Sequence, residues 1–333
     1  MIAHVCSNTK KSRLAVASTV IIWFNIFYIF VFLLLQNIVG MGPGVTHIDE
    51  GTYLNPETNV CDGFESFAIL IGHSYYCVVA ALDYSIPAIL LVQILIYIST
   101  SFFIYERLKD FCKNNAAYIF LLLVVFDPYR AHLAVHILKE TFVIAGVCLM
   151  LSNGFLGLFV STAFRFFSII YLFITLKPLM ITCLLAFLAI TLRFLLPDLF
   201  FHIQGGGNNE MIFREFDTVP TFNQFGLLGD LVRSLLWPMF LMTGAFVIFA
   251  PNLLYFVVAL GAAASLNFVI LQRMKLKVLI GPFVAMAILA FVTPGFTSFT
   301  RYAYPIVIVL PLLSRKHSKS LLAKVKDRNN EQA

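Results

Sequence analysis

Apolar stretches long enough to cross a bilayer recur along this chain, and they constrain its fold more than any other feature. Hydrophobic residues make up 60% and charged residues only 12% of the 333 positions. A soluble domain has roughly 45–50% apolar and about 25% charged residues. A helix needs about 20 residues to span a bilayer, and backbone amides in lipid must bond within the segment. The sequence therefore predicts an all-α, polytopic integral membrane protein.

We expect about ten membrane-spanning helices in a single integral membrane domain that covers residues 1–333. The first span is too long for the core of a signal peptide and is interpreted as an uncleaved helix. An external segment at 40–84 is expected to contain an interfacial helix at 67–82. The segment 202–235 has no clear assignment to either side. The expected spans cover residues 14–39, 85–105, 116–127, 131–151, 155–176, 178–198, 236–250, 252–272, 278–293 and 300–314.

Lysine and arginine residues gather at the ends of the expected spans. The net charge of +6 is therefore spread over several segments, which argues against a nucleic-acid partner. By the positive-inside rule these segments face the cytoplasm, so that both termini are cytoplasmic and the number of spans is even. The basic segments are Lys10, Lys11 and Arg13, then Arg107, Lys109 and Lys113, then Arg273, Lys275 and Lys277, and finally the tail at 315–333.

The six cysteines contain no C-x-x-C pair, so a cysteine-based zinc or redox motif is not predicted. Cys61 and Cys77 fall in the same external segment and could form a disulfide in an oxidising compartment. Connectivity cannot be read from sequence, so both the free and the paired state stay open.

An acidic cluster directly follows the first expected span. Asp49 and Glu50 come first and Tyr53 follows them. A carboxylate at the membrane face could act as a general base on an acceptor hydroxyl, and a carboxylate pair could hold a divalent cation beside a phosphate. The alternative is a solvated acidic loop. We take Asp49 and Glu50 as candidate catalytic residues and Tyr53 as a candidate substrate-binding residue.

A second polar group begins at Asp127-Pro128, where the proline is expected to break a helix. Arg130 and Lys139 could neutralise a phosphate, and an arginine can do so with two hydrogen bonds. The alternative is an internal salt bridge of Lys139, either with Glu140 or with a neighbouring helix. An H-x-x-x-H spacing also occurs here, but the glutamate that follows the first histidine in zinc proteases is missing. From the first histidine onward, the spacing puts the polar residues largely on one helical face: His132, His136, Lys139 and Glu140.

Four further polar residues lie within or beside apolar stretches. Arg165 falls inside an expected span, and a buried arginine needs a partner. Lys177 ends the same span and could bind substrate or extend to the interface. Arg301 and Tyr302 begin the last span; they could form an aromatic belt with an interfacial arginine, or a phosphate-binding site that faces Asp49 and Glu50.

Short elements of the chain resemble the GT-C class of membrane glycosyltransferases. Asp49-Glu50-Gly51-Thr52-Tyr53 resembles their D-E-x-x-Y element, and Arg301-Tyr302-Ala303-Tyr304-Pro305 is similar to an R-Y-x-x-P element. The run from Asp127 to Glu140 looks like a helix–turn–helix of relatives found in bacterial polysaccharide gene clusters, beside O-antigen polymerases of the Wzy type. The chain has short external loops and no large domain after the last span, which favours a lipid-linked glycan over a protein acceptor.

The resemblance implies an enzyme of the bacterial inner (plasma) membrane that acts among membrane lipids on a polyprenyl-phosphate-linked or diphosphate-linked glycan. Asp49 would be the general base, with Glu50 assisting it. Arg301, together with Lys139 or Arg130, would stabilise the charge of the leaving phosphate. No cofactor is certain, and a divalent cation could take part. A repeat-unit polymerase would use the same groups, whereas a transporter of lipid-linked sugars would place polar residues along a central path.

Overall fold

The computed structural model describes residues 2–40, 42–43, 48–58, 61, 67–112, 114–174, 219–249, 253–272, 277–293 and 295–331. Every regular element in these ranges is helical, which confirms the predicted all-α class. The α-helices are α1 (Ile2–Ile38), α2 (Ile48–Leu54), α3 (Phe67–Ala81), α4 (Ile86–Leu108), α5 (Asn115–Val125), α6 (Pro128–Val135), α7 (Glu140–Met150), α8 (Gly154–Phe164), α12 (Gly226–Thr243), α13 (Leu253–Leu271), α14 (Lys277–Val292) and α15 (Phe296–Glu331). The 3₁₀ helices are η1 (Pro56–Thr58), η3 (Lys109–Phe111), η4 (Phe166–Ile174), η5 (Asn223–Phe225) and η6 (Ala245–Ile248).

Within these ranges, 5 helical segments are long and apolar enough to cross a membrane. The chain is therefore a membrane protein by length and composition of its helices, but the expected number of about ten spans is not confirmed. The expected span 178–198 lies outside the described residues. The long segments are Thr19–Ile38, Ile86–Phe111, Asn115–Val135, Leu253–Leu271 and Phe296–Leu313, and shorter apolar helices cover Glu140–Met150, Gly154–Phe164 and Leu279–Val292.

The expected single helix over 131–151 is wrong, because the chain leaves helical geometry between α6 and α7. His136 is extended, with φ −111° and ψ 155°. The Glu50 carboxylate accepts a hydrogen bond from the amide of Ile137 at 2.8 Å, so that a side chain replaces the helical partner of this amide. The polar residues from His132 to Glu140 therefore do not share one continuous helical face.

The expected span 155–176 is also interrupted, at Arg165. This residue is extended, with φ −152° and ψ 113°, and it separates α8 from the 3₁₀ helix η4. In contrast, the break expected at Pro128 is confirmed. Asp127 caps α6 by accepting from the amides of Tyr129 and Arg130, and Pro128 occupies the first turn, where no donor is needed.

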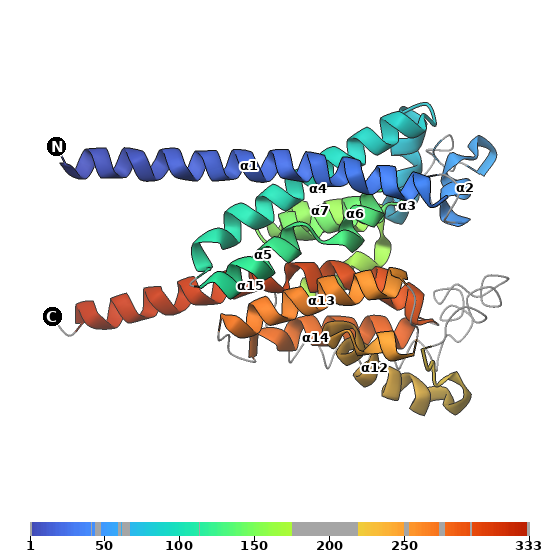
Figure 1. The fold of residues 1–333 in the computed structure, drawn as a ribbon. Coiled ribbons are helices and arrows are strands. Elements are labelled where there is room, and N and C mark those ends of the chain that lie inside the picture. Colours follow the sequence, from blue (N-terminus) through green and yellow to red (C-terminus); the bar gives the residue numbers. More distant parts are fainter. Residues whose placement is uncertain are drawn as a thin grey trace.

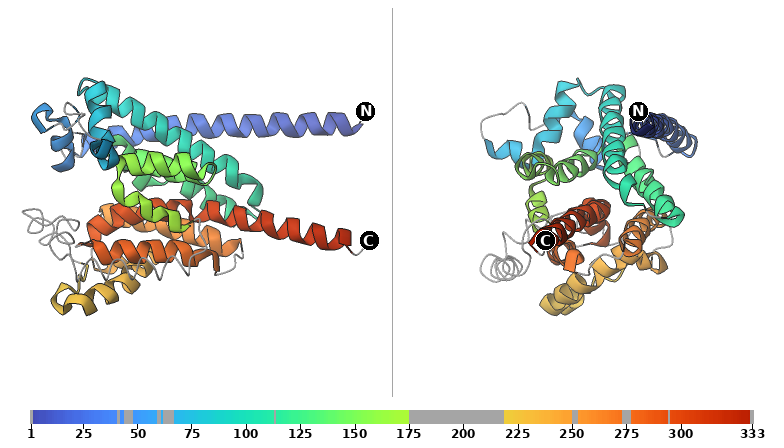
Figure 2. Two further views of the ribbon diagram at one scale, coloured as in Figure 1. Left: turned by 180° about the vertical axis from the view of Figure 1, so that it is seen from behind. Right: turned by 90° about the vertical axis from the view of Figure 1, so that its left-hand side faces the viewer.

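Helix α15 packs against α4, α7, α12, α13 and α14 and forms the centre of the bundle. Both chain ends extend from the same side of the bundle, while α2 and α3 lie at the opposite end (Figures 1 and 2). The basic segments in α1, at the end of α4 and in the last part of α15 lie toward the side of the termini (Figure 1). The positive-inside rule predicts that this side faces the cytoplasm.

A disulfide joins Cys61 to Cys77 in α3 and closes the chain between them. The pairing is one of the two states that the sequence left open. The helix expected at 67–82 is present as α3, and its Tyr75 packs edge-to-face on Tyr53 of α2, with ring centroids 4.8 Å apart. The disulfide and this aromatic contact hold α2 and α3 together at the end of the bundle that is remote from the termini.

Helices α7 and α8 pack closely, and glycines allow it. A Cβ on Gly157 would overlap the backbone of Met150. Gly157→Ala is expected to lower the free energy of unfolding by about 1–3 kcal/mol, because overpacking forces the two backbones apart. Gly154→Ala is the control, since a Cβ there meets nothing within 4 Å. Thermal unfolding of the purified proteins in one detergent measures both, and equal midpoints would contradict the close contact.

Candidate functional site

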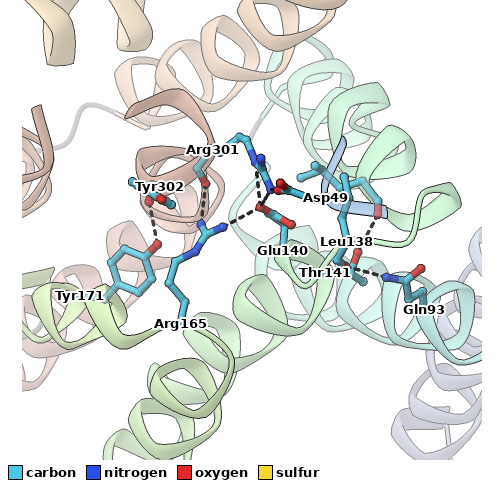
Figure 3. Close-up of polar contacts among 10 residues, drawn as sticks. Asp49, Gln93, Leu138, Glu140, Thr141, Arg165, Tyr171, Arg301 and Tyr302 are labelled. Atoms are coloured by element: carbon cyan, nitrogen blue, oxygen red, sulfur yellow. Dashed lines mark hydrogen bonds and ion pairs between the residues drawn. The ribbon is translucent and has the colours of Figure 1, made fainter. Parts of the chain in front are cut away.

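The centre of the candidate site is the carboxylate of Glu140, at the start of α7. Its Oε1 accepts hydrogen bonds from Arg165 Nη2 at 2.6 Å, from Arg301 Nε at 2.9 Å and from Arg301 Nη2 at 2.5 Å (Figure 3). Glu140 is 0% exposed and Arg165 is 3% exposed. The break before α7 places Glu140 here, and the break after α8 places Arg165 opposite it. The buried arginine that the sequence singled out therefore has its partner.

Asp49 lies at the open edge of this cluster. Its Oδ2 is 2.8 Å from Arg301 Nη2, and its side chain is 38% exposed, against 22% for Arg301. Residues far apart in the sequence thus meet as predicted: the acidic segment after the first span faces the arginine of the last span (Figure 3). Among the residues that the structure describes, Arg301 Nη1 forms no hydrogen bond. One edge of the guanidinium therefore remains available to an acceptor.

Arg165 also fixes the first part of α15. Its Nη1 donates to the carbonyl oxygen of Arg301 at 3.1 Å, and its guanidinium lies 4.3 Å from the ring centre of Tyr302. The hydroxyl of Tyr171 donates to the carbonyl oxygen of Tyr302 at 2.6 Å. These contacts fix the backbone of the turn that carries Arg301, and they therefore help to orient the Arg301 side chain (Figure 3).

Lys139 is the residue before Glu140, at the N-cap of α7. Burial, followed by the nearby charge of Arg165, lowers the pKa of Lys139 to about 8. In the described part of the chain its ammonium group forms no ion pair or hydrogen bond. Among the described residues, the cluster then has three cations, Lys139, Arg165 and Arg301, and two carboxylates, Asp49 and Glu140. It carries one positive charge more than it can pair, and an anion would balance it.

Glu50 points away from Asp49 and into the protein. Its Oε1 lies 3.1 Å from His136 Nδ1 and accepts from the amide of Ile137, and the side chain is 0% exposed. His136 Nε2 lies 3.0 Å from Gln36 Oε1. The network therefore ties α1, α2 and the α6–α7 break together, and it positions the α2 turn that carries Asp49.

Arg130 and His132 lie deeper in the bundle. Arg130 Nη2 donates to the hydroxyls of Thr100 and Ser101, each at 2.9 Å, and these contacts join α6 to α4. His132 Nδ1 lies 3.4 Å from Gln36 Nε2, in the network of Glu50 and His136. Arg130 therefore belongs to the contact between α6 and α4, and His132 belongs to the network of Glu50 and His136.

Tyr53 packs beside the cluster at the base of α2. It is buried, and burial together with the charges of Glu140 and Asp49 raises the pKa of its phenol, which stays neutral. Its ring also contacts Tyr76, with centroids 5.0 Å apart. Gln93 lies next to these tyrosines. It donates to Tyr75 Oη at 3.0 Å and to the carbonyl oxygen of Leu138 at 2.6 Å.

Sequence reasoning missed two amides, Gln36 and Gln93. Both lie in long apolar stretches, Gln36 next to Asn37 and Gln93 without a neighbouring amide. The free-energy cost of a polar side chain in lipid is the signal that points to buried partners. Lys177, a predicted substrate-binding residue, lies outside the described residues. In the described ranges no group of three or more His, Cys, Asp or Glu side chains could hold a metal ion, and a divalent cation stays a prediction.

The segment 202–235 is described only from residue 219 onward. Asp230 and Arg233 in α12 form a buried ion pair at 2.7 Å. Arg233 also donates to the carbonyl oxygens of Ala290 and Phe291, at 2.9 and 3.2 Å. These are carbonyls of the last turn of α14, so Arg233 caps that helix and ties it to α12.

Comparison of the chain with protein-family models, with curated proteins and with solved structures gave no match.

Proposed function

We propose that the protein is a membrane glycosyltransferase that takes a sugar from a polyprenyl phosphate and adds it to a lipid-linked cell-surface polysaccharide, such as an O-antigen or a capsule. The observation that carries the proposal is the cluster at the end of the bundle remote from the termini. There a partly exposed carboxylate, Asp49, lies beside cations that exceed their carboxylate partners by one charge. A proton acceptor next to an anion site is what glycosyl transfer from a phosphate requires.

The reaction is a direct displacement at the anomeric carbon. The acceptor hydroxyl oxygen forms a bond to this carbon while the bond from the carbon to the phosphate oxygen breaks. The proton of the hydroxyl passes to Asp49, and the phosphate leaves with the electron pair. Arg301 Nη1 and the ammonium of Lys139 receive the charge that develops on the leaving oxygen. Burial of Glu140 and Arg165 behind them keeps these groups in place and strengthens their electrostatic effect.

The other candidate residues support this centre. Glu50 and His136 hold α2 against the α6–α7 break, and Tyr53 packs α2 on α3. Tyr302 directly follows Arg301, and Tyr53 packs beside the cluster. Both are proposed to contact the sugar or the phosphate. Arg130 and His132 are proposed to stabilise the bundle below the site. Arg130 donates to Thr100 of α4, and His132 lies beside Gln36 of α1.

We place the site on the outer face of a bacterial inner membrane, with both termini in the cytoplasm. Two independent features support this side. The basic segments lie at the end of the termini, as expected for cytoplasmic loops. The disulfide lies at the opposite end, beside Asp49, and disulfides persist in oxidising compartments.

The surplus of one positive charge favours a phosphodiester, which carries a single negative charge, over a diphosphate. A repeat-unit polymerase of the Wzy type would act on a diphosphate-linked glycan with the same groups. Mass spectrometry of lipid extracts from a deletion strain separates the two. We expect an accumulated polyprenyl phosphate that carries one sugar. An accumulated single repeat on a diphosphate would point to the polymerase, and unchanged lipid extracts would contradict both enzymes.

The pKa of Lys139 predicts a pH dependence of donor binding. Lys139 is charged below pH 8 and loses its proton as the pH rises through about 8. The apparent KM for the donor should therefore rise above this pH, by at most about tenfold per pH unit because one proton is lost. Lys139→Arg stays charged and should give a flat KM over the same range. A wild-type KM that is equally flat between pH 7 and 9.5 would exclude Lys139 from the phosphate site.

A further inference from the structure

Asp49 and Glu140 share one nitrogen of the same guanidinium, Arg301 Nη2, at 2.8 and 2.5 Å. Their surroundings differ. Glu140 is fully buried and holds three guanidinium hydrogen bonds on one oxygen, two of them from Arg301 itself. Asp49 is 38% exposed and has a single ion-pair contact with Arg301. The two carboxylates are therefore not equivalent partners.

Glu140 cannot leave this arrangement at low cost, because its departure would strand two arginines in the protein interior. Asp49 can leave, because an exposed ion pair contributes little and water can solvate the released carboxylate. A phosphate that enters the site would use the free Nη1 of Arg301 and compete for Nη2, since a guanidinium prefers to bind an oxyanion with two parallel hydrogen bonds. Such a phosphate would also repel Asp49 by its like charge.

A carboxylate that is paired with a guanidinium holds a proton weakly and is a poor general base. A carboxylate that has lost this partner and gained an anionic neighbour holds a proton more tightly. In the structure, Asp49 is paired with Arg301 Nη2 at 2.8 Å.

We infer that Arg301 is exchanged between Asp49 and the donor phosphate, so that binding of the polyprenyl phosphate releases Asp49 and makes it a competent base. This exchange rests on the proposed function and adds a regulatory step to it. The base stays inactive while the donor site is empty, and the donor must bind before the acceptor hydroxyl can lose its proton. Glu140 keeps Arg301 in position throughout the exchange.

The exchange predicts an unusual result for ligand affinity. Removing the Asp49 charge should tighten the binding of a phosphate-bearing lipid, because the competitor for Arg301 is gone. We expect Asp49→Asn to bind farnesyl phosphate about 3–10-fold more tightly than the wild type does, since a competing ion pair and a like charge are both removed. Its affinity for farnesol, which lacks the phosphate, should not change. Asp49→Ala is a second variant that should behave in the same way.

The control is Glu57→Gln in η1, which removes the same charge from an exposed position in the same external segment. Affinities of the full-length proteins are measured in one detergent by microscale thermophoresis. If Glu57→Gln tightens binding as much as Asp49→Asn does, the effect is one of overall charge and the exchange is wrong. If Asp49→Asn and Asp49→Ala bind farnesyl phosphate equally or more weakly than the wild type, Asp49 does not compete for Arg301. If the wild type does not prefer farnesyl phosphate to farnesol, the phosphate site of the proposed function fails as well.

Discussion

Glu140→Gln is expected to lower the free energy of unfolding by about 3–5 kcal/mol, because it leaves two buried guanidinium groups without the charge that balances them. Arg165 is 3% exposed and has Glu140 as its carboxylate partner. Arg301 would keep only the exposed contact with Asp49. Thermal unfolding of the purified variant in detergent measures the loss, and transfer activity should fall with it because Arg301 is no longer held.

Asp49→Asn is the matched control, since it removes the other carboxylate from the same guanidinium. Asp49 is 38% exposed, so its ion pair should contribute less than about 1 kcal/mol. The double variant Glu140→Gln/Arg165→Met should recover part of the stability, because it removes one of the unpaired charges. If Glu140→Gln proves as stable as Asp49→Asn, the buried cluster does not have the structural role that its geometry indicates.

Asp49→Asn is expected to reduce the rate of sugar transfer by about 10²–10⁴-fold, the usual contribution of a general base. An amide cannot accept the hydroxyl proton, whereas the fold and the phosphate site remain intact because the side chain lies at the exposed edge of the cluster. The measurement is the single-turnover rate in membranes, with the donor that is recovered from the deletion strain. The loss should appear in kcat, while the KM for the donor should not rise.

Glu57→Gln should leave the transfer rate unchanged, because Glu57 is exposed and belongs to the short helix η1. Glu50→Gln tests a different contact, since Glu50 holds the α6–α7 break through His136 and Ile137. It should lower stability as well as rate. A transfer rate for Asp49→Asn within tenfold of the wild type would contradict the role of Asp49 as base.

Composition and the length of the apolar stretches were enough to predict an all-helical membrane protein, because lipid leaves few alternatives to helices. Helix ends were predicted where a side chain or a proline specifies them locally, as Asp127 and Pro128 do before α6. The break at His136 could not be predicted in this way. At this break the amide of Ile137 donates to the carboxylate of Glu50, which lies 87 residues earlier in the sequence.

In the site, too, the features that local sequence specifies could be predicted, and those that depend on packing between distant segments could not. Asp49 and Arg301 were predicted to face one another, because each follows or begins a span at the same end of the bundle. The adjacent carboxylates Asp49 and Glu50 could not be distinguished by sequence, although one faces Arg301 and the other His136. Glu140 was placed among substrate-binding residues or in a salt bridge with Lys139. Its partners Arg165 and Arg301 come from other helices, and only packing brings them together.

The most direct test of the central claim, that Asp49 is the base of a glycosyl transfer, is a profile of the surface glycan in cells. The compared cells carry the deletion, Asp49→Asn or Glu57→Gln, with both variants present at the wild-type protein level. We expect Asp49→Asn to reproduce the altered or shortened glycan of the deletion, and Glu57→Gln to give the wild-type glycan. If Asp49→Asn leaves the glycan intact and the deletion does not, Asp49 is not catalytic, and a transporter of lipid-linked sugars becomes the better account.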